Sequence, residues 1–408
     1  MTKRIPILLL AGSLLALMLA CVVPVEPVMT VTAVPPTEAS IPPTATPPPV
    51  PVQGLNQIQM IDQANGWAWA GKPDGTSMLL RTADGGSTWA DVTPQNLPGP
   101  SAGFFLDAQT AWVQTFDSAT NASGLGMTTD GGRTWTAVNQ SLPFVSSFFH
   151  FYNKTDGYAE IYDVGAGQAT VGFYETHDSG ANWDQIMLAS PPEDVVPGFL
   201  HTCNICGDDV YYDPTRLIVV FGDMANDPAG SVRLQVSADL GKTWKKLVLP
   251  LPAAKYADGL IGPGDPVFFD DRNGLLPFVI VKFNQDGTKA YSDQFVYSTQ
   301  DGGLTWKSNS TAVANVDWMS RVDFATSRDA FVACGNALCA SHDGTVTWQA
   351  LTSNLNFAYA DGTVYVSHFQ FIDSSQGWAI TTDGTNYNLW KTTDGGQTWT
   401  ELSPSLIP

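Results

Sequence analysis

The sequence predicts an all-β repeat protein with seven modules of about 50 residues each, the size of a propeller blade. Three observations lead to this fold class: a turn motif that recurs seven times, a second motif upstream of each copy, and no convincing helical periodicity. The turn motif has the form Ser/Thr-x-Asp-x-Gly-x-Thr-Trp and is clearest at 82–89, 128–135 and 392–399. Looser copies occur at 176–183, 237–244, 299–306 and 341–348.

The second motif is an aromatic residue or Met, which we call the anchor, with a polar residue two positions later. The anchors are Met60, Phe105, Phe151, Tyr211, Phe268, Phe324 and Phe371. The polar residues are Asp62, Asp107, Asn153, Asp213, Asp270, Thr326 and Asp373. Anchors and turn motifs alternate without exception, so each module is expected to contain four strands, A to D. Strand A is expected to end at the polar residue, strand B is apolar, strand C runs into the turn motif and strand D leaves from its Trp.

The composition excludes several classes of protein. There are 19 Lys and Arg against 39 Asp and Glu, a formal net charge of −20. Binding nucleic acid or anionic lipid by charge requires clustered basic residues, so neither is expected as a partner. A hydrophobic content of 44% argues against overall disorder, and five Cys are too few for a scaffold built on disulfides.

The first 20 residues have the features of a signal peptide. Lys3 and Arg4 precede an apolar run, 5–20, of the size of a signal-peptide core. The segment 17–21 resembles a bacterial lipobox, with Met18 where that motif usually has Leu. The resemblance implies that Cys21 is lipidated and anchors the protein to a membrane outside the cytoplasm. The alternative is an ordinary secretory signal with an incidental Cys.

Residues 21–53 are expected to form a disordered stalk. The segment 22–53 contains ten Pro and no aromatic residue, a composition that favours polyproline II and cannot form a core. Residues 54–408 then form the repeat domain.

The two repeated motifs together resemble the Asp-box, or BNR repeat, of sialidases, sortilin-type receptors, xyloglucan-degrading enzymes and photosystem II assembly-factor-like proteins. The resemblance is closest to the last group. It implies a seven-bladed β-propeller of four-stranded antiparallel blades, with an Asp-box at each turn between strands C and D. The Asp-box residues are Asp84, Asp130, Asp178, Asp239, Asp301, Asp343 and Asp394. Asp is expected to accept N–H groups within its own turn, and a Ca²⁺ site is the alternative. Only one carboxylate recurs per motif, so no metal is expected.

The function implied by this resemblance is a non-catalytic module that binds a protein or a glycan through the loop-bearing face or the central channel. We expect no catalytic residue and no cofactor. The protein is expected to be a monomer. The other reading is an extracytoplasmic glycoside hydrolase, either sialidase-like or xyloglucanase-like. The only Arg-Ile-Pro motif lies in the signal peptide, which disfavours a sialidase. Hydrolysis would need two nearby carboxylates. The candidate pairs are Asp208/Asp209, Asp223/Asp227 and Asp270/Asp271.

Three Arg residues follow strand A in successive modules: Arg216, Arg272 and Arg328. They are expected on the Asp-box face, either as a basic cluster that docks an acidic or C-terminal segment, or as separate solvated turn residues. His150 and His368 lie near strand A beside aromatic residues and are expected in the core or the channel.

The four remaining Cys form two close pairs. Cys203 and Cys206 are expected to form one disulfide, and Cys334 and Cys339 another across the B–C hairpin of the sixth module. Bridging between the two pairs is the alternative. Either pairing leaves Cys21 as the odd Cys.

Overall fold

The structure is a computed structural model. It describes residues 50–72, 74–142, 148–165, 168–189, 208–213, 216–221, 231–251, 256, 258–308, 312–316, 321–358 and 364–407. They belong to one unit of the chain, Pro49–Pro408. The predicted signal peptide, Cys21, most of the stalk and the Cys203–Cys206 pair lie outside the described residues. Within those ranges, no helical segment has the length and apolarity that crossing a membrane requires.

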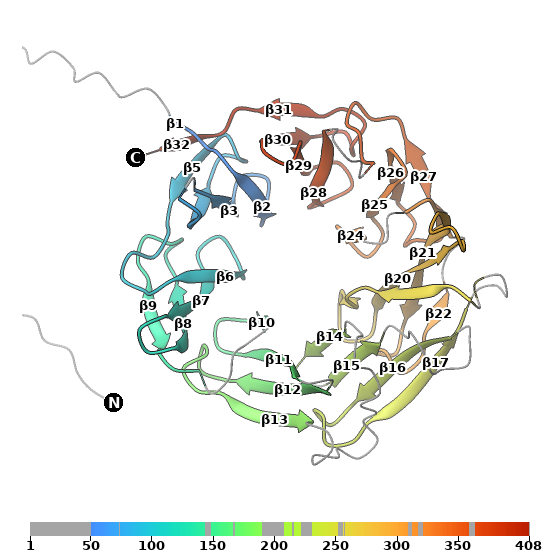
Figure 1. Ribbon diagram of the computed structural model, residues 1–408, viewed down its shortest axis with the longest axis horizontal. Coiled ribbons are helices and arrows are strands. Elements are labelled where there is room, and N and C mark those ends of the chain that lie inside the picture. The colour runs from blue at the N-terminus through green and yellow to red at the C-terminus, as the bar shows by residue number, and fades with distance from the viewer. Residues whose placement is uncertain are drawn as a thin grey trace, which may run out of the picture. The chain divides into compact units, whose positions relative to one another are not determined.

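The described residues form seven sheets, numbered here in chain order, which Figure 1 shows arranged in a ring. Sheet 1 contains β2 (Leu55–Met60), β3 (Gly66–Gly71), β4 (Ser77–Thr82) and β5 (Thr88–Asp91), joined by β32 (Ser405–Ile407) and β1 (Val50–Pro51). Sheet 2 contains β6 (Pro100–Phe105), β7 (Ala111–Asp117), β8 (Ala122–Thr128) and β9 (Thr136–Asn139). Sheet 3 contains β10 (Phe148–Phe151), β11 (Gly157–Gly165), β12 (Gln168–Thr176) and β13 (Asp184–Ala189). Sheet 4 contains β14 (Asp208–Asp213), β15 (Arg216–Phe221), β16 (Ser231–Ser237) and β17 (Lys245–Pro250).

The remaining sheets continue the pattern. Sheet 5 contains β18 (Leu260–Pro263), β19 (Val267–Phe268), β20 (Gly274–Phe283), β21 (Lys289–Thr299), β22 (Lys307–Ser308) and β23 (Val313–Ala314). Sheet 6 contains β24 (Asp323–Phe324), β25 (Ala330–Cys334), β26 (Ala337–Ser341) and β27 (Gln349–Leu351). Sheet 7 contains β28 (Tyr365–Phe371), β29 (Gly377–Thr382), β30 (Tyr387–Thr392) and β31 (Thr400–Leu402).

Five of these sheets are four-stranded and antiparallel, with their strands in chain order. Sheet 5 keeps the same order, but β18 and β19 share the place of strand A, and β22 and β23 share that of strand D. In the sheets whose first strand is labelled in Figure 1, that strand lies toward the centre of the ring. The fold is an all-β β-propeller with four-stranded antiparallel blades.

Aromatic pairs hold neighbouring sheets together. The ring of Trp112 in strand B of sheet 2 stacks on the anchor Phe151 of sheet 3, with centroids 3.8 Å apart. Phe331 of sheet 6 stacks in the same way on the anchor Phe371 of sheet 7 at 3.6 Å. The anchor of one sheet thus fills the face of the sheet before it. Because each pair buries apolar surface that one sheet alone leaves exposed, the ring needs every neighbour.

The turn between strands C and D is held by its Asp. In sheet 1, Oδ1 of Asp84 accepts the N–H of Thr88 at 2.9 Å, and Oδ2 accepts the Thr88 hydroxyl at 2.6 Å. The Asp in each of the other six turn motifs also accepts the N–H of the residue four positions later. The hydroxyl and then the N–H of Thr134 lower the pKa of Asp130 to about 2. Each carboxylate is therefore ionised at neutral pH and fixes its own hairpin.

We expect Asp394→Ala to lower the free energy of unfolding by about 1–2 kcal/mol, because Asp394 accepts the N–H of Thr398 and the hydroxyl of Thr392, both at 2.8 Å. Urea unfolding would measure the change. The control is Glu401→Ala, an exposed carboxylate in the same sheet. Equal midpoints for the two variants would contradict the turn-locking role.

The two ends of the described chain meet on sheet 1. Strand β32 pairs in parallel with β5 and antiparallel with β1. The N–H of Val52 donates to the carbonyl of Pro404 at 2.9 Å. Sheet 1 therefore has its own four strands, and the C-terminal strand is added beyond them. The sequence motifs carried no information on this closure.

Candidate functional site

The turn motifs and the A–B turns lie on one face of the propeller. In sheet 7, the N–H of Gly395 in the C–D turn donates to the carbonyl of Ser375 in the A–B turn at 2.9 Å. The corresponding bond recurs in sheets 1, 2, 3, 5 and 6. In an antiparallel sheet, the D–A and B–C connections then lie at the opposite face, which we call the loop face.

The three predicted Arg residues make separate local contacts. Arg216 is the first residue of β15, whereas Arg272 and Arg328 lie in A–B turns as expected. The guanidinium of Arg216 lies 4.7 Å above the ring of Phe268, and Arg216 is only 7% exposed. Nε of Arg272 donates to the carbonyl of Gln300 at 3.1 Å, and Nη2 of Arg328 to that of His342 at 3.4 Å. Arg216 is thus a packing residue and not the solvated turn residue that was one of the two expectations.

The predicted acid pairs are placed only in part. Asp270 Oδ1 accepts the N–H groups of Arg272 and Asn273 at 2.8 and 2.7 Å, so it caps the A–B turn. Asp271 is the next residue of this turn. Asp208 and Asp209 lie in β14, where the structure describes the backbone, and Asp223/Asp227 lie outside the described residues.

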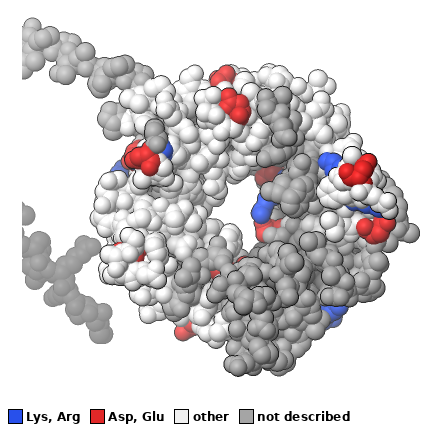
Figure 2. All heavy atoms as spheres, viewed as in Figure 1, with Lys and Arg blue, Asp and Glu red and all other residues white. Residues whose placement is uncertain are grey.

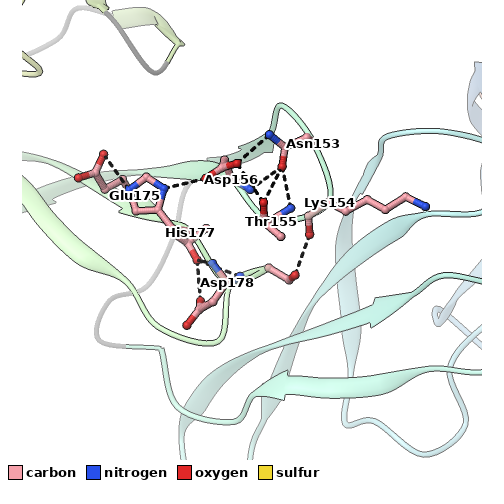
Figure 3. A network of polar contacts seen from close by, with 10 residues as sticks. Asn153, Lys154, Thr155, Asp156, Glu175, His177 and Asp178 are labelled. Atoms are coloured by element: carbon pink, nitrogen blue, oxygen red, sulfur yellow. Dashed lines mark hydrogen bonds and ion pairs between the residues drawn. The ribbon is translucent and has the colours of Figure 1, made fainter. Parts of the chain in front are cut away.

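Two exposed His–Asp contacts join A–B and C–D turns. Nδ1 of His177 contacts Oδ1 of Asp156 at 2.7 Å, and its Nε2 lies 3.8 Å from Glu175 (Figure 3). Nδ1 of His342 and Asp329 repeat the contact in sheet 6 at 2.8 Å. The hydrogen bond to Asp156 raises the pKa of His177. Among the described residues, no group of three or more His, Cys, Asp or Glu side chains could hold a metal ion.

The predicted bridge across the B–C hairpin of sheet 6 is present. Cys334 and Cys339 are joined by a disulfide, with Cα atoms 5.8 Å apart. The bridge closes the hairpin between β25 and β26.

A cavity of about 580 Å³ lies against the innermost strands of sheets 1, 6 and 7. Figure 2 shows the ring open at its centre. The lining includes residues at the starts of β24 and β28 and the D–A connections before them, so the cavity lies toward the loop face. Its polar lining residues are Gln57, Gln59, Arg321, Asp323, Tyr365, Ser367, His368 and Gln370. Its apolar lining residues are Ile58, Val322, Ala333, Phe357, Val366 and Phe369.

The side chain of the residue directly before an anchor can connect the inner strand of its sheet to that of the next sheet. Gln370 accepts the N–H of Met60 at 2.7 Å and donates to its carbonyl at 3.0 Å. Gln59 donates to the carbonyl of Phe105 in sheet 2 at 3.1 Å. Inner strands have an edge without a further strand, so their backbone groups need such partners.

His368 is fixed within this wall. Its Nε2 contacts the carbonyl of Ile58 at 3.0 Å, and a carbonyl only accepts, so Nε2 has the proton and Nδ1 is an acceptor. Burial lowers the pKa of His368, and the bond to Ile58 opposes the shift. His150 occupies the inner strand of sheet 3, 4.5 Å from the ring of Phe104, and burial lowers its pKa to about 4. Both His are neutral at pH 7.

Asp323 is the functional candidate that sequence reasoning missed. Its Oδ2 accepts the N–H of the anchor Phe371 in sheet 7. Burial raises the pKa of Asp323 to about 7, and the bond from Phe371 opposes the shift. A carboxyl that titrates near neutral pH beside a cavity can bind or exchange protons with a ligand. Its position directly before the anchor matches Gln59 and Gln370, and this was the available signal.

Comparison with known proteins supports the fold and does not assign a function. No family model and no curated protein matches the chain. The structure is similar to an ulvan lyase from a new family of polysaccharide lyases, with a TM-score of 0.53, 12% identity, and coverage of 87% of this chain and 97% of that one. It is also similar to YCF48 bound to D1 peptide, with a TM-score of 0.47, 17% identity and coverage of 83% and 94%. The β-propeller domain of the Trilobed protease from Pyrococcus furiosus gives 0.45, 8% identity and coverage of 85% and 97%.

Proposed function

We propose that this protein is an extracytoplasmic, lipid-anchored, seven-bladed Asp-box propeller that binds a protein or a glycan without catalysis, as photosystem II assembly-factor-like propellers are expected to do. The observation that carries this proposal is the cavity at the inner strands. Its volume of about 580 Å³ lies in the usual range of ligand sites, and its wall combines amide, hydroxyl and aromatic side chains. Each of the seven sheets would be one blade, and Cys21 would hold the membrane anchor.

The absence of a second acid in the cavity lining supports a non-catalytic role. Glycoside hydrolysis uses two carboxyl groups on either side of the scissile bond. Among the residues that line the described cavity, Asp323 is the single acid. Arg321, which lines the cavity, has Asp265 outside the lining as its ionic partner at 2.7 Å, and both side chains are largely exposed.

A glycoside hydrolase is the second candidate, and Asp323 is the observation that favours it. A carboxyl group with a pKa of about 7 holds a proton near neutral pH, as a general acid must. By its description, the ulvan lyase acts on a polysaccharide. At 12% identity, however, the similarity supports a shared fold alone.

A paired screen separates the two candidates. The full chain would be applied to glycan and peptide arrays and, in parallel, to fluorogenic glycosides with and without Asp323→Asn. We expect saturable binding of at least one ligand class and no turnover of any glycoside. Turnover that Asp323→Asn abolishes would overturn the non-catalytic proposal. The control variant is Asp286→Asn, an exposed acid in the β20–β21 turn.

A further inference from the structure

We propose that the cavity binds a cationic group, the guanidinium or ammonium of an extended basic peptide segment, with Asp323 as its counter-charge. This inference rests on the proposed binding function and names its ligand. It commits to a peptide over a glycan, because charge complementarity favours the peptide.

The first argument is that one oxygen of Asp323 is free to accept. Among the described residues, Oδ2 has the N–H of Phe371 as its partner and Oδ1 has none. The free oxygen belongs to a residue that lines the cavity. Asp323 is partly exposed, so a ligand that supplies a donor at this point would replace solvent and would not displace a protein partner.

The second argument is that, among the described residues, no cation is paired with Asp323. Arg321, two residues away, contacts Asp265, and the Arg321 side chain is 79% exposed. Burial is the main cause of the raised pKa of Asp323, and the opposing contribution comes from the Phe371 N–H. The other titratable groups that line the cavity are Tyr365 from the start of β28 and His368 from its middle. A bound cation would favour the ionised carboxylate and lower its pKa again.

The third argument is that the rest of the wall suits a cation on a hydrocarbon stem. Nδ1 of the neutral His368 is an acceptor, because the proton on Nε2 is donated in a hydrogen bond to the carbonyl of Ile58. Phe369 and Tyr365 supply aromatic surface, over which a guanidinium or ammonium is attracted to the ring face. The long stem of Arg or Lys would lie along the apolar lining.

The fourth argument concerns the irregular inner strands and the charge of the chain. β2 and β28 each contain a register shift near their first residues, between Leu55 and Gln57 and between Val366 and His368. Such bulges re-aim side chains and end regular pairing. On the inner edges of these strands, the N–H and C=O of Met60, the C=O of Ile58 and the N–H of Phe371 are already paired with side chains. The segment would therefore be held mainly through its cationic side chain. The formal charge of −20 attracts a basic segment and repels an acidic one.

Calorimetric titration of the full chain tests the proposal with two blocked pentapeptides, one with arginine and one with its neutral isostere citrulline at the centre of four glycines. At pH 8 we expect the arginine peptide to bind at least tenfold more tightly. At pH 5.5 its affinity should fall about 30-fold, because a carboxyl of pKa about 7 is then almost entirely protonated and the binding-competent fraction is small.

Variants locate the effect. Asp323→Asn keeps an acceptor for the Phe371 N–H and removes the charge, so it should abolish both the arginine preference and the pH dependence. Asp286→Asn should retain both. Equal binding of arginine and citrulline, a preference that survives Asp323→Asn, or no peptide binding would overturn the inference. Glucose and glucosamine form a further pair of probes: binding of a neutral sugar without peptide binding would leave the proposed function standing and reject the cationic ligand.

Discussion

Trp378→Ala is expected to lower the free energy of unfolding by about 3–5 kcal/mol. Trp378 is fully buried in strand B of sheet 7, in a cluster with residues of sheet 1. Its indole N–H donates to the carbonyl of Gly85 at 2.9 Å, and the ammonium of Lys391 lies 4.8 Å from its ring. The substitution removes a large buried side chain and leaves the Gly85 carbonyl and the cation without these partners.

The expected loss is large because this interface closes the ring. Sheets 7 and 1 are far apart in the chain, and their contact includes Gln370 on Met60 and His368 on Ile58. Guanidinium chloride unfolding, followed by Trp fluorescence and circular dichroism, would measure the change. The control is Trp390→Ala in the same sheet, a half-buried Trp that donates to Thr381 at 2.8 Å within that sheet. An equal loss of unfolding free energy in the two variants would show that the ring-closing contacts of Trp378 contribute no additional stability.

The sequence predicted what depends on residues within one module. The turn motif, the anchor and its polar partner are local patterns, and each corresponds to hydrogen bonds within about five residues, as at Asp62, which accepts the N–H of Asn65. Local departures from the pattern are accommodated by the backbone: Thr345 stands where other motifs have Gly and adopts a φ of 67°. Repetition made these short patterns readable.

Contacts between modules were not readable. Gln59, Asp323 and Gln370 occupy one position of strand A but differ in chemistry, and their partners lie in the next sheet. The three residues of β32 are too few to show a period. In sheet 5, Pro263 and Pro266 lie where strand A is divided into β18 and β19, because Pro donates no N–H to a ladder.

Asp323→Asn is expected to make the protein more stable than the unsubstituted chain at pH 8, by about 2–3 kcal/mol. The carboxyl has a pKa of about 7 when folded and about 4 when unfolded, so between these values the folded state holds a proton that the unfolded state has lost. The stability that this proton contributes is complete below pH 4 and is lost as pH rises through 7. A full shift of three pKa units would correspond to about 4 kcal/mol, and partial exposure of the side chain reduces it.

The difference between the two proteins is the quantity to measure, by urea unfolding from pH 4 to 8. His150, with a pKa of about 4, makes stability rise with pH between about 4 and 6.5, which is the opposite slope. It contributes equally to both proteins and cancels in the difference. The difference should therefore grow steadily above pH 5 for Asp323→Asn and stay flat for the exposed Asp286→Asn. A flat difference for Asp323→Asn would mean that the Asp323 carboxyl is already ionised and solvated, and a cation would then gain no more there than at an exposed surface carboxylate.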